Sequence, residues 1–116
     1  MARTTESDGP RAGDAATIWH LTRDGVPARR GAEGFVHCSY TPQLAGTIDV
    51  HFAGAQELVL LRLDRERLGP RLVAEPSRGG ALFPHLYGEI EADDIAARVT
   101  LRRGEDGCFD LSRLPL

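Results

Sequence analysis

The stretch ELVLLRL, Glu57 to Leu63, decides the fold class of this chain. It is short and almost wholly apolar, which predicts a central β-strand buried on both faces. Upstream, the branched and aromatic run TIWHLT, Thr17 to Thr22, predicts the strand that opens the domain. Further strands are predicted at residues 34–39 (GFVHCS), at residues 71–76 (RLVAEP), and within residues 77–90, where a glycine-rich loop runs into a strand.

One helix is predicted between these strands, within YTPQLAGTIDVHFA. Thr41 suits its N-cap and Pro42 suits its first turn. Leu44, Ile48 and Phe52 recur at four-residue spacing and would form one apolar stripe. Shorter helical turns are predicted at residues 64–70 and 92–97, and a hairpin-like connection between residues 98–103 and 107–114.

These elements predict a single α+β domain over residues 17–116, with one main helix and short helical turns. Residues 1–16 are polar, contain glycine and proline and show no periodicity, so we expect a disordered leader there. With 116 residues, 41% hydrophobic and 27% charged, the composition is that of an ordinary globular domain.

The charge and cysteine content restrict the partners and the compartment. A net charge of -3 argues against binding to duplex nucleic acid, which favours a basic protein face. No apolar run is long enough to span a bilayer, so no membrane partner is expected. The two cysteines lie far apart and no signal-like segment is visible at the start, which favours a cytoplasmic setting.

Histidines supply most of the chemically capable side chains. His20, His37 and His85 fall in or at the ends of predicted strands, whereas His51 lies on the predicted helix. The ordinary interpretation of one such histidine is a half-buried ring whose nitrogens bond to backbone groups. Three in comparable positions, in a chain with only 6% aromatic residues, favour a shared site.

The sequence GFVHCS leaves several chemistries open, among them a nucleophile with its base, half of a metal site and a substrate clamp. Alternation along a strand would turn His37 and Ser39 to one face and Cys38 to the other. This geometry disfavours a histidine-activated thiolate, and it disfavours zinc bound by neighbouring His and Cys. Cys38 is expected to pack as a small buried hydrophobe, and no metal ligand is assigned.

A second motif, GGALFPHLYG, presents an imidazole beside an aromatic ring. His85 and Tyr87 share one face of the predicted strand at period two. This pairing suits a planar ring or a ribose better than a metal ion. Glu75 and Glu89 are the carboxylates nearest to this motif in the sequence.

Taken together, IWHLT, EGFVHCS, LVLLRLDRERLG, VAEP and LFPHLYGEI resemble the small bacterial family catalogued as domain of unknown function 952. The resemblance runs from about Thr17 to Ala96. That family is grouped with the ADP-ribosyltransferase-like superfamily, whose members share a split β-sheet core around a cleft for a nicotinamide dinucleotide. The resemblance therefore implies this fold type, with NAD as a possible substrate.

The resemblance also implies roles for particular residues. His20 is similar to the first-strand histidine that holds a ribose hydroxyl. His37 and Ser39 stand in the second motif, and His85 and Tyr87 stand in the third. Glu89 is a candidate for the catalytic acid, but no acid is clearly identifiable at the usual position.

We expect a domain that binds NAD or a related nucleotide or ribosyl compound, with transfer or cleavage at an N-glycosidic bond as the possible chemistry. RNA 2'-phosphotransferase-like group transfer is a variant of this expectation. The alternatives are a noncatalytic nucleotide- or metabolite-binding module and a metal-dependent hydrolase. The expected catalytic residues are His20, His37, His85 and Tyr87, and the expected binding residues are His20, Ser39, Glu75, His85 and Tyr87.

Overall fold

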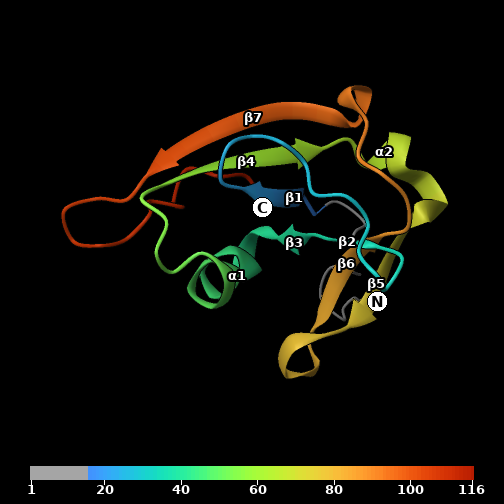
Figure 1. Cartoon of the computed structure of the whole chain (residues 1–116), viewed down its shortest axis with the longest axis horizontal. Helices are drawn as coiled ribbons and strands as arrows, with labels where there is room; N and C mark the ends of the chain where they lie inside the picture. Colours follow the sequence, from blue (N-terminus) through green and yellow to red (C-terminus); the bar gives the residue numbers. More distant parts are fainter. Residues whose placement is uncertain (1–15) are drawn as a thin grey trace, which may run out of the picture.

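The larger of two β-sheets is built around the apolar strand β4, Glu57–Leu63. The computed structural model describes residues 16–116, so nearly all of the predicted leader, residues 1–16, lies outside the described residues. Strand β4 pairs antiparallel with β1 on one side and β7 on the other, and β3 pairs with β1 (Figure 1). The remaining strands of this sheet are β1, Ile18–Thr22, β3, Ser39–Tyr40, and β7, Ile95–Arg102.

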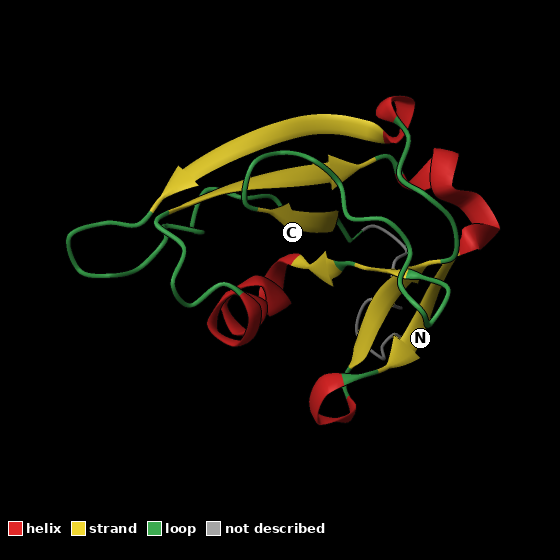
Figure 2. Cartoon of the chain, in the orientation of Figure 1, coloured by secondary structure: helices red, strands yellow, loops and turns green. Residues whose placement is uncertain are grey.

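The smaller sheet has three strands in the order β2-β6-β5, all antiparallel (Figure 2). They are β2, Val36–His37, β5, Leu72–Pro76, and β6, Leu82–Leu86. The predicted α+β class is confirmed, with two separate sheets and short helices.

The chain passes from the smaller sheet to the larger one at Cys38, between β2 and β3. The Cys38 amide donates to the carbonyl oxygen of Pro84 at 3.1 Å. Proline has no N–H to return that bond, so the ladder ends there and the chain leaves the sheet. The prediction of one continuous strand over residues 34–39 is therefore wrong.

The predicted helix forms as α1, Leu44–His51, preceded by the 3₁₀ turn η1, Thr41–Gln43. Leu44 and Ile48 are buried as their spacing predicts. The prediction of Thr41 as N-cap is wrong, because its hydroxyl accepts from the Trp19 indole at 2.8 Å and donates to the Pro115 carbonyl. The Thr41 side chain therefore makes tertiary hydrogen bonds instead of capping the helix.

The turn predicted at residues 64–70 contains α2, Arg65–Leu68. Of the turn predicted at residues 92–97 only η4, Ala92–Asp94, is found, because residues 95–97 belong to β7. The 3₁₀ turns η2, Gly69–Arg71, and η3, Arg78–Gly80, flank β5. Residues 107–114 form no strand, so the predicted hairpin near Gly104 is wrong. Phe109 of this segment is instead buried against the core.

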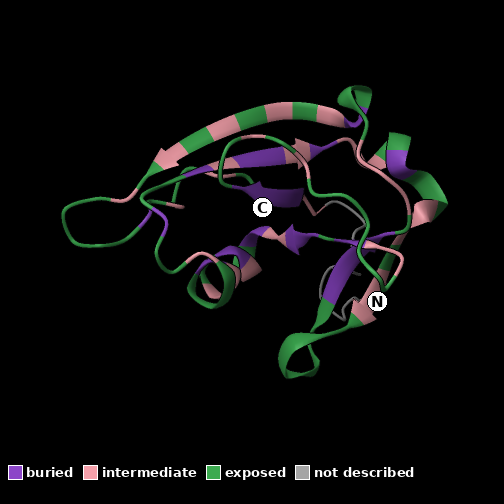
Figure 3. Cartoon of the chain, in the orientation of Figure 1, coloured by how far each residue is buried: buried purple, intermediate pink, exposed green. Residues whose placement is uncertain are grey.

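Both faces of the larger sheet are covered, which explains the apolar sequence of β4. Leu58 and Leu60 pack with α1 and the C-terminal segment on one face. Leu61 and Leu63 turn to the other face and pack against the smaller sheet. Figure 3 shows buried residues along β1 and β4, whereas β7 alternates between half-buried and exposed residues.

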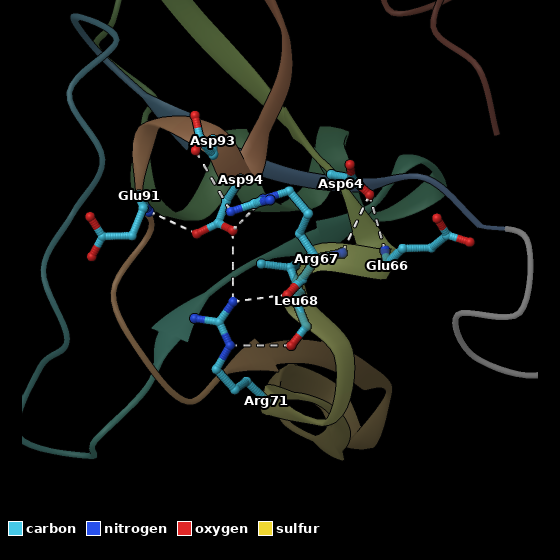
Figure 4. A network of polar contacts seen from close by, with 8 residues as sticks. All are labelled: Asp64, Glu66, Arg67, Leu68, Arg71, Glu91, Asp93 and Asp94. Carbon is cyan, nitrogen blue, oxygen red and sulfur yellow. Dashed lines mark hydrogen bonds and ion pairs between the residues drawn. The ribbon is translucent and has the colours of Figure 1, made fainter.

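A buried carboxylate of η4 joins this turn to α2 and to η2, the turn that precedes β5 (Figure 4). Asp94, whose side chain is 3% exposed, lies 3.5 Å from Arg67 Nε and 3.7 Å from Arg71 Nη2. Its other oxygen accepts from the Glu91 amide at 2.8 Å. The Arg71 carbonyl in turn accepts from the Tyr87 amide at 2.8 Å, so this network fixes the end of β6.

Candidate functional site

The outer face of the smaller sheet carries a cluster of aromatic and ionisable side chains. Its inner face packs on the larger sheet through Val36 and Leu86. Because side chains alternate along a strand, the neighbours His37, His85 and Tyr87 turn outward. His37 and His85 are directly opposite each other across β2 and β6. The outer-face cluster, as we define it, comprises Phe35, His37, Glu75, His85 and Tyr87.

The rings of this cluster are in contact. Phe35 stacks on His85, with ring centroids 3.9 Å apart and planes 12° apart. His37 meets His85 edge-on at 5.4 Å, and Phe35 lies 5.4 Å from the Tyr87 ring. The structure therefore brings together three of the predicted catalytic residues, His37, His85 and Tyr87.

Glu75 joins two of these side chains from the neighbouring strand β5. Its Oε1 lies 2.7 Å from His85 Nδ1 and accepts the Tyr87 hydroxyl at 2.7 Å. These hydrogen bonds, from Tyr87 first and then His85, hold the pKa of the Glu75 carboxyl below its ordinary value. The same contact raises the pKa of the Tyr87 hydroxyl. Glu75 is therefore ionised at neutral pH and acts only as an acceptor.

His85 is buried, and its two ring nitrogens differ in what they contact. Nδ1 faces Glu75, whereas Nε2 is hidden from solvent and has no hydrogen-bond partner among the described residues. A buried polar atom without a partner is rare in folded proteins and calls for an explanation. This atom is the feature of the cluster that a bound molecule could satisfy.

His37 lies at the exposed rim of the cluster. Its side chain is 64% exposed, and Nε2 lies 3.9 Å from a Glu33 carboxylate oxygen. Desolvation lowers the pKa of His37, and the positive charge of a protonated His85 acts in the same direction. The ring is therefore largely neutral at neutral pH and available as donor or acceptor.

His20 lies beneath the cluster rather than within it. Its Nε2 accepts the Ala28 amide at 3.1 Å, so Nδ1 carries the proton and donates to the His37 carbonyl at 2.9 Å. Burial lowers the pKa of this histidine. Both nitrogens are thus engaged within the protein, and the ring fastens the loop before β2 to strand β1.

Ser39 lies apart from the outer-face cluster because β3 belongs to the other sheet. It is buried, and its hydroxyl lies 3.1 Å from the Thr47 hydroxyl of α1. Cys38 faces the core, as predicted, and burial raises the pKa of its thiol to about 12. A thiol with this pKa is protonated at neutral pH and is not a nucleophile.

Glu89 is tied to the loop that precedes β2. Its carboxylate lies 3.4 Å from Arg29 Nε and 3.2 Å from Arg30 Nε, and it accepts the Arg30 amide. A hollow of roughly 270 Å³ lies beside it, lined by Pro27, Ala28, Arg29, Glu89, Ile90 and Glu91. Of the two carboxylates considered from the sequence, only Glu75 contacts His85 and Tyr87.

Two residues of this region were missed in the sequence. Phe35 stands two positions before His37, so the same alternation that groups His37 with His85 could have placed it on this face. Arg78, in η3, lies over the Phe83 ring at 4.8 Å, and Phe83 shares the outer face with His85 at period two. No sequence signal pointed to Arg78.

Two general properties of the described residues also bear on the alternatives. Over residues 16–116, no group of three or more His, Cys, Asp and Glu side chains is arranged to hold a metal ion. Within the same range, none of the helices has the length and apolar character needed to cross a membrane.

Fold and site define a two-sheet α+β domain with a histidine, a glutamate and a tyrosine joined on the outer face of its smaller sheet. The chain belongs to the family described as "Protein of unknown function (DUF952)", which matches residues 15–98. A search of the curated proteins gives no match.

Solved structures of protein CC0527 from Caulobacter crescentus are similar to this chain. In the X-ray structure of CC0527 the sequence is 30% identical to this chain, and the TM-score is 0.67. The alignment covers 82% of this chain and 94% of CC0527. Its solution NMR structure is 31% identical, covers 78% and 89% of the two chains, and has a TM-score of 0.64. The two-sheet architecture thus recurs in an experimentally solved relative.

Proposed function

We propose that this protein binds a nucleotide or ribosyl compound, such as NAD, at the outer-face cluster, as an ADP-ribosyltransferase-like domain. The observation that carries the proposal is the contact of Glu75 with both His85 and Tyr87, beside the ring of Phe35. Aromatic rings favour stacking with a nicotinamide or nucleobase ring. The imidazole and phenol groups supply hydrogen bonds of the kind that a ribose needs.

A phosphate-bearing ligand needs a cation near the rings, and Arg78 meets this need. Its guanidinium lies over Phe83, and its Nη2 donates to the Thr47 hydroxyl at 3.4 Å. It has no ion-pair partner within residues 16–116. Arginine matches phosphate oxygens with two parallel donors, so we assign the phosphate of the ligand to Arg78.

If the domain is catalytic, the reaction supported is cleavage or transfer at the N-glycosidic carbon of the ligand. An ionised carboxylate stabilises positive charge that develops on a ribose ring. Glu75 is the better candidate for this role than Glu89, because Glu89 is occupied by Arg29 and Arg30. The resemblance to the superfamily supports the same chemistry.

A noncatalytic binding module is the second candidate, and the geometry of His20 favours it. In the transferases that the chain resembles, the first-strand histidine holds a ribose hydroxyl. Here both His20 nitrogens are engaged by protein groups. A domain that has lost this contact could retain ligand binding without turnover.

Calorimetry with NAD, ADP-ribose and a 2'-phosphorylated ribonucleotide tests the proposal. We expect one of the three to bind at millimolar concentration or below, and His85→Ala to abolish that binding. Arg102→Ala, at an exposed position on β7 in the other sheet, is the matched control and should bind as the wild type does. Absence of binding by all three compounds would refute the proposed function. Release of nicotinamide from bound NAD separates an enzyme from a binding module.

A further inference from the structure

Nε2 of His85, which has no hydrogen-bond partner within residues 16–116, permits a more specific inference, which rests on the proposed function. Leaving a buried donor or acceptor unpaired is unfavourable because the group has lost its water without gaining a partner. His85 is 4% exposed and Nε2 itself is hidden from solvent. Nε2 therefore needs a water molecule or a ligand atom as its hydrogen-bond partner. It belongs to the outer-face cluster, where the ligand is proposed to bind.

The hydrogen-bond partner of Nδ1 determines whether Nε2 is a hydrogen-bond donor or an acceptor. Glu75 is ionised and has no proton to give, so the proton between Glu75 and His85 belongs to Nδ1. In the neutral ring Nε2 then carries a lone pair and no proton. It is an acceptor, and the ligand atom that meets it must be a donor. A sugar hydroxyl satisfies this requirement, whereas a phosphate oxygen does not.

Access to Nε2 is limited by the segment that leads into β2. The Phe35 ring covers the face of the His85 imidazole, and the His37 ring lies against its edge. Phe35 follows Gly34, whose φ of +90° belongs to the region that glycine adopts without strain. Phe35 is only half-buried, so rotation of its side chain toward solvent would uncover His85.

We propose that Nε2 of His85 accepts a hydrogen bond from a hydroxyl group of the ligand. Glu75 is the positioning residue that fixes the Nδ1–H tautomer of His85. Phe35 is the movable side chain that covers the imidazole. When the ligand hydroxyl is deprotonated, its O–H bond breaks and an N–H bond forms at Nε2. The resulting imidazolium is stabilised by the Glu75 carboxylate 2.7 Å away. The ligand oxygen retains the electron pair.

Diethyl pyrocarbonate, which reacts with unprotonated imidazole nitrogens, tests the cover and the free nitrogen together. The sites are read by peptide mass spectrometry. In the wild type we expect exposed His51 to react fast and His85 slowly. Phe35→Ala should accelerate the reaction of His85 about tenfold, which corresponds to lowering the free energy of local opening by about 1.4 kcal/mol. Phe35→Leu, which keeps apolar bulk, should leave His85 close to the wild-type rate. Equal rates at His85 in a folded Phe35→Ala variant would overturn the assignment of the cover.

Long-range ¹H–¹⁵N NMR of the imidazole rings tests the tautomer directly. We expect the proton of His85 on Nδ1 in the wild type, and a mixture of tautomers in Glu75→Ala. A proton on Nε2 of the neutral wild-type ring would overturn the proposal even if ADP-ribose binds. A proton on Nδ1 with no binding of NAD, ADP-ribose or the 2'-phosphorylated ribonucleotide would refute the proposed function and support Nε2 as acceptor for another hydroxyl compound.

A ligand comparison gives a readout that a purely structural His85 would not change. If ADP-ribose binds, its analogues lacking one ribose hydroxyl should include one that binds on the order of tenfold more weakly, because Nε2 is left unpaired. In His85→Ala that difference should disappear. Equal affinity of the wild type for all the analogues would contradict the hydroxyl assignment.

Discussion

Phe35 and His85 lie ring on ring, 3.9 Å apart, although 50 positions separate them in the sequence. The contact arises because β2, which Phe35 directly precedes, pairs with β6, which contains His85, and both side chains turn away from the core. A stacked ring protects the imidazole from water, and it offers a planar ligand a similar surface to replace. The region between the two rings is thus the place where we expect a ligand ring to compete with Phe35.

The hydrogen bond from Tyr87 to Glu75 should make stability depend on pH. The folded-state pKa of Glu75 is lowered, so its contribution is present above the ordinary value of 4.5 and is lost as the pH falls through the folded value. Tyr87→Phe removes the larger of the two hydrogen bonds that cause this shift. We expect this variant to lose less stability than the wild type as the pH is lowered from 4.5 through the folded-state pKa, as measured by urea unfolding at a series of pH values. Identical pH profiles would contradict the role of the Tyr87 hydroxyl.

His20 should act as a neutral structural histidine. Its folded-state pKa lies below the ordinary 6.5, so the unfolded chain takes up the proton first and stability falls as the pH drops below that value. His20→Ala should cost about 1–3 kcal/mol at neutral pH, because the Ala28 amide and the His37 carbonyl lose their partner. Urea unfolding measures both effects. Unchanged stability of the variant would show that the loop is held by other contacts.

The buried carboxylate of Asp94 should be important for stability, unlike its exposed neighbour. Asp94→Ala removes the shared partner of Arg67 and Arg71 and the acceptor of the Glu91 amide, and it should destabilise the fold by about 1–3 kcal/mol. Asp93, with a side chain 84% exposed, is the matched control, and Asp93→Ala should cost less than about 1 kcal/mol. Thermal unfolding of the two variants makes the comparison. Similar losses in both would contradict the network in Figure 4 as a stabilising feature.

The two thiols should differ sharply in reactivity. Cys108 is exposed, whereas Cys38 is buried with a pKa of about 12. In the folded protein we expect Ellman's reagent to modify Cys108 quickly and Cys38 only after unfolding. Cys108→Ser should therefore remove all rapid reaction. Rapid modification of Cys38 in that variant would mean that the β2–β3 crossing opens readily.

Alternation of side chains along strands was enough to predict much of the cluster. It grouped His85 with Tyr87, and it turned Cys38 away from His37, as the structure confirms. Glu75 was noted only as a carboxylate close in sequence. Its contacts with His85 and Tyr87 depend on the pairing of β5 with β6, which local patterns do not specify.

The predictions that failed depend on partners distant in the sequence. Ser39 was expected beside His37, but the missing N–H of Pro84 ends the ladder and sends the chain into the other sheet. Threonine is a common N-cap residue, yet the Thr41 hydroxyl is hydrogen-bonded to Trp19 and to Pro115 instead. No local window of sequence contains these partners.

An NMR titration of the ¹⁵N-labelled protein with ADP-ribose tests the central claim most directly. We predict saturable shifts centred on the backbone amides of Phe35, His85 and Tyr87, with the amide signals of β7 unchanged. No shifts at millimolar ligand, or shifts confined to the hollow between Arg29 and Glu91, would contradict a binding site at the outer-face cluster.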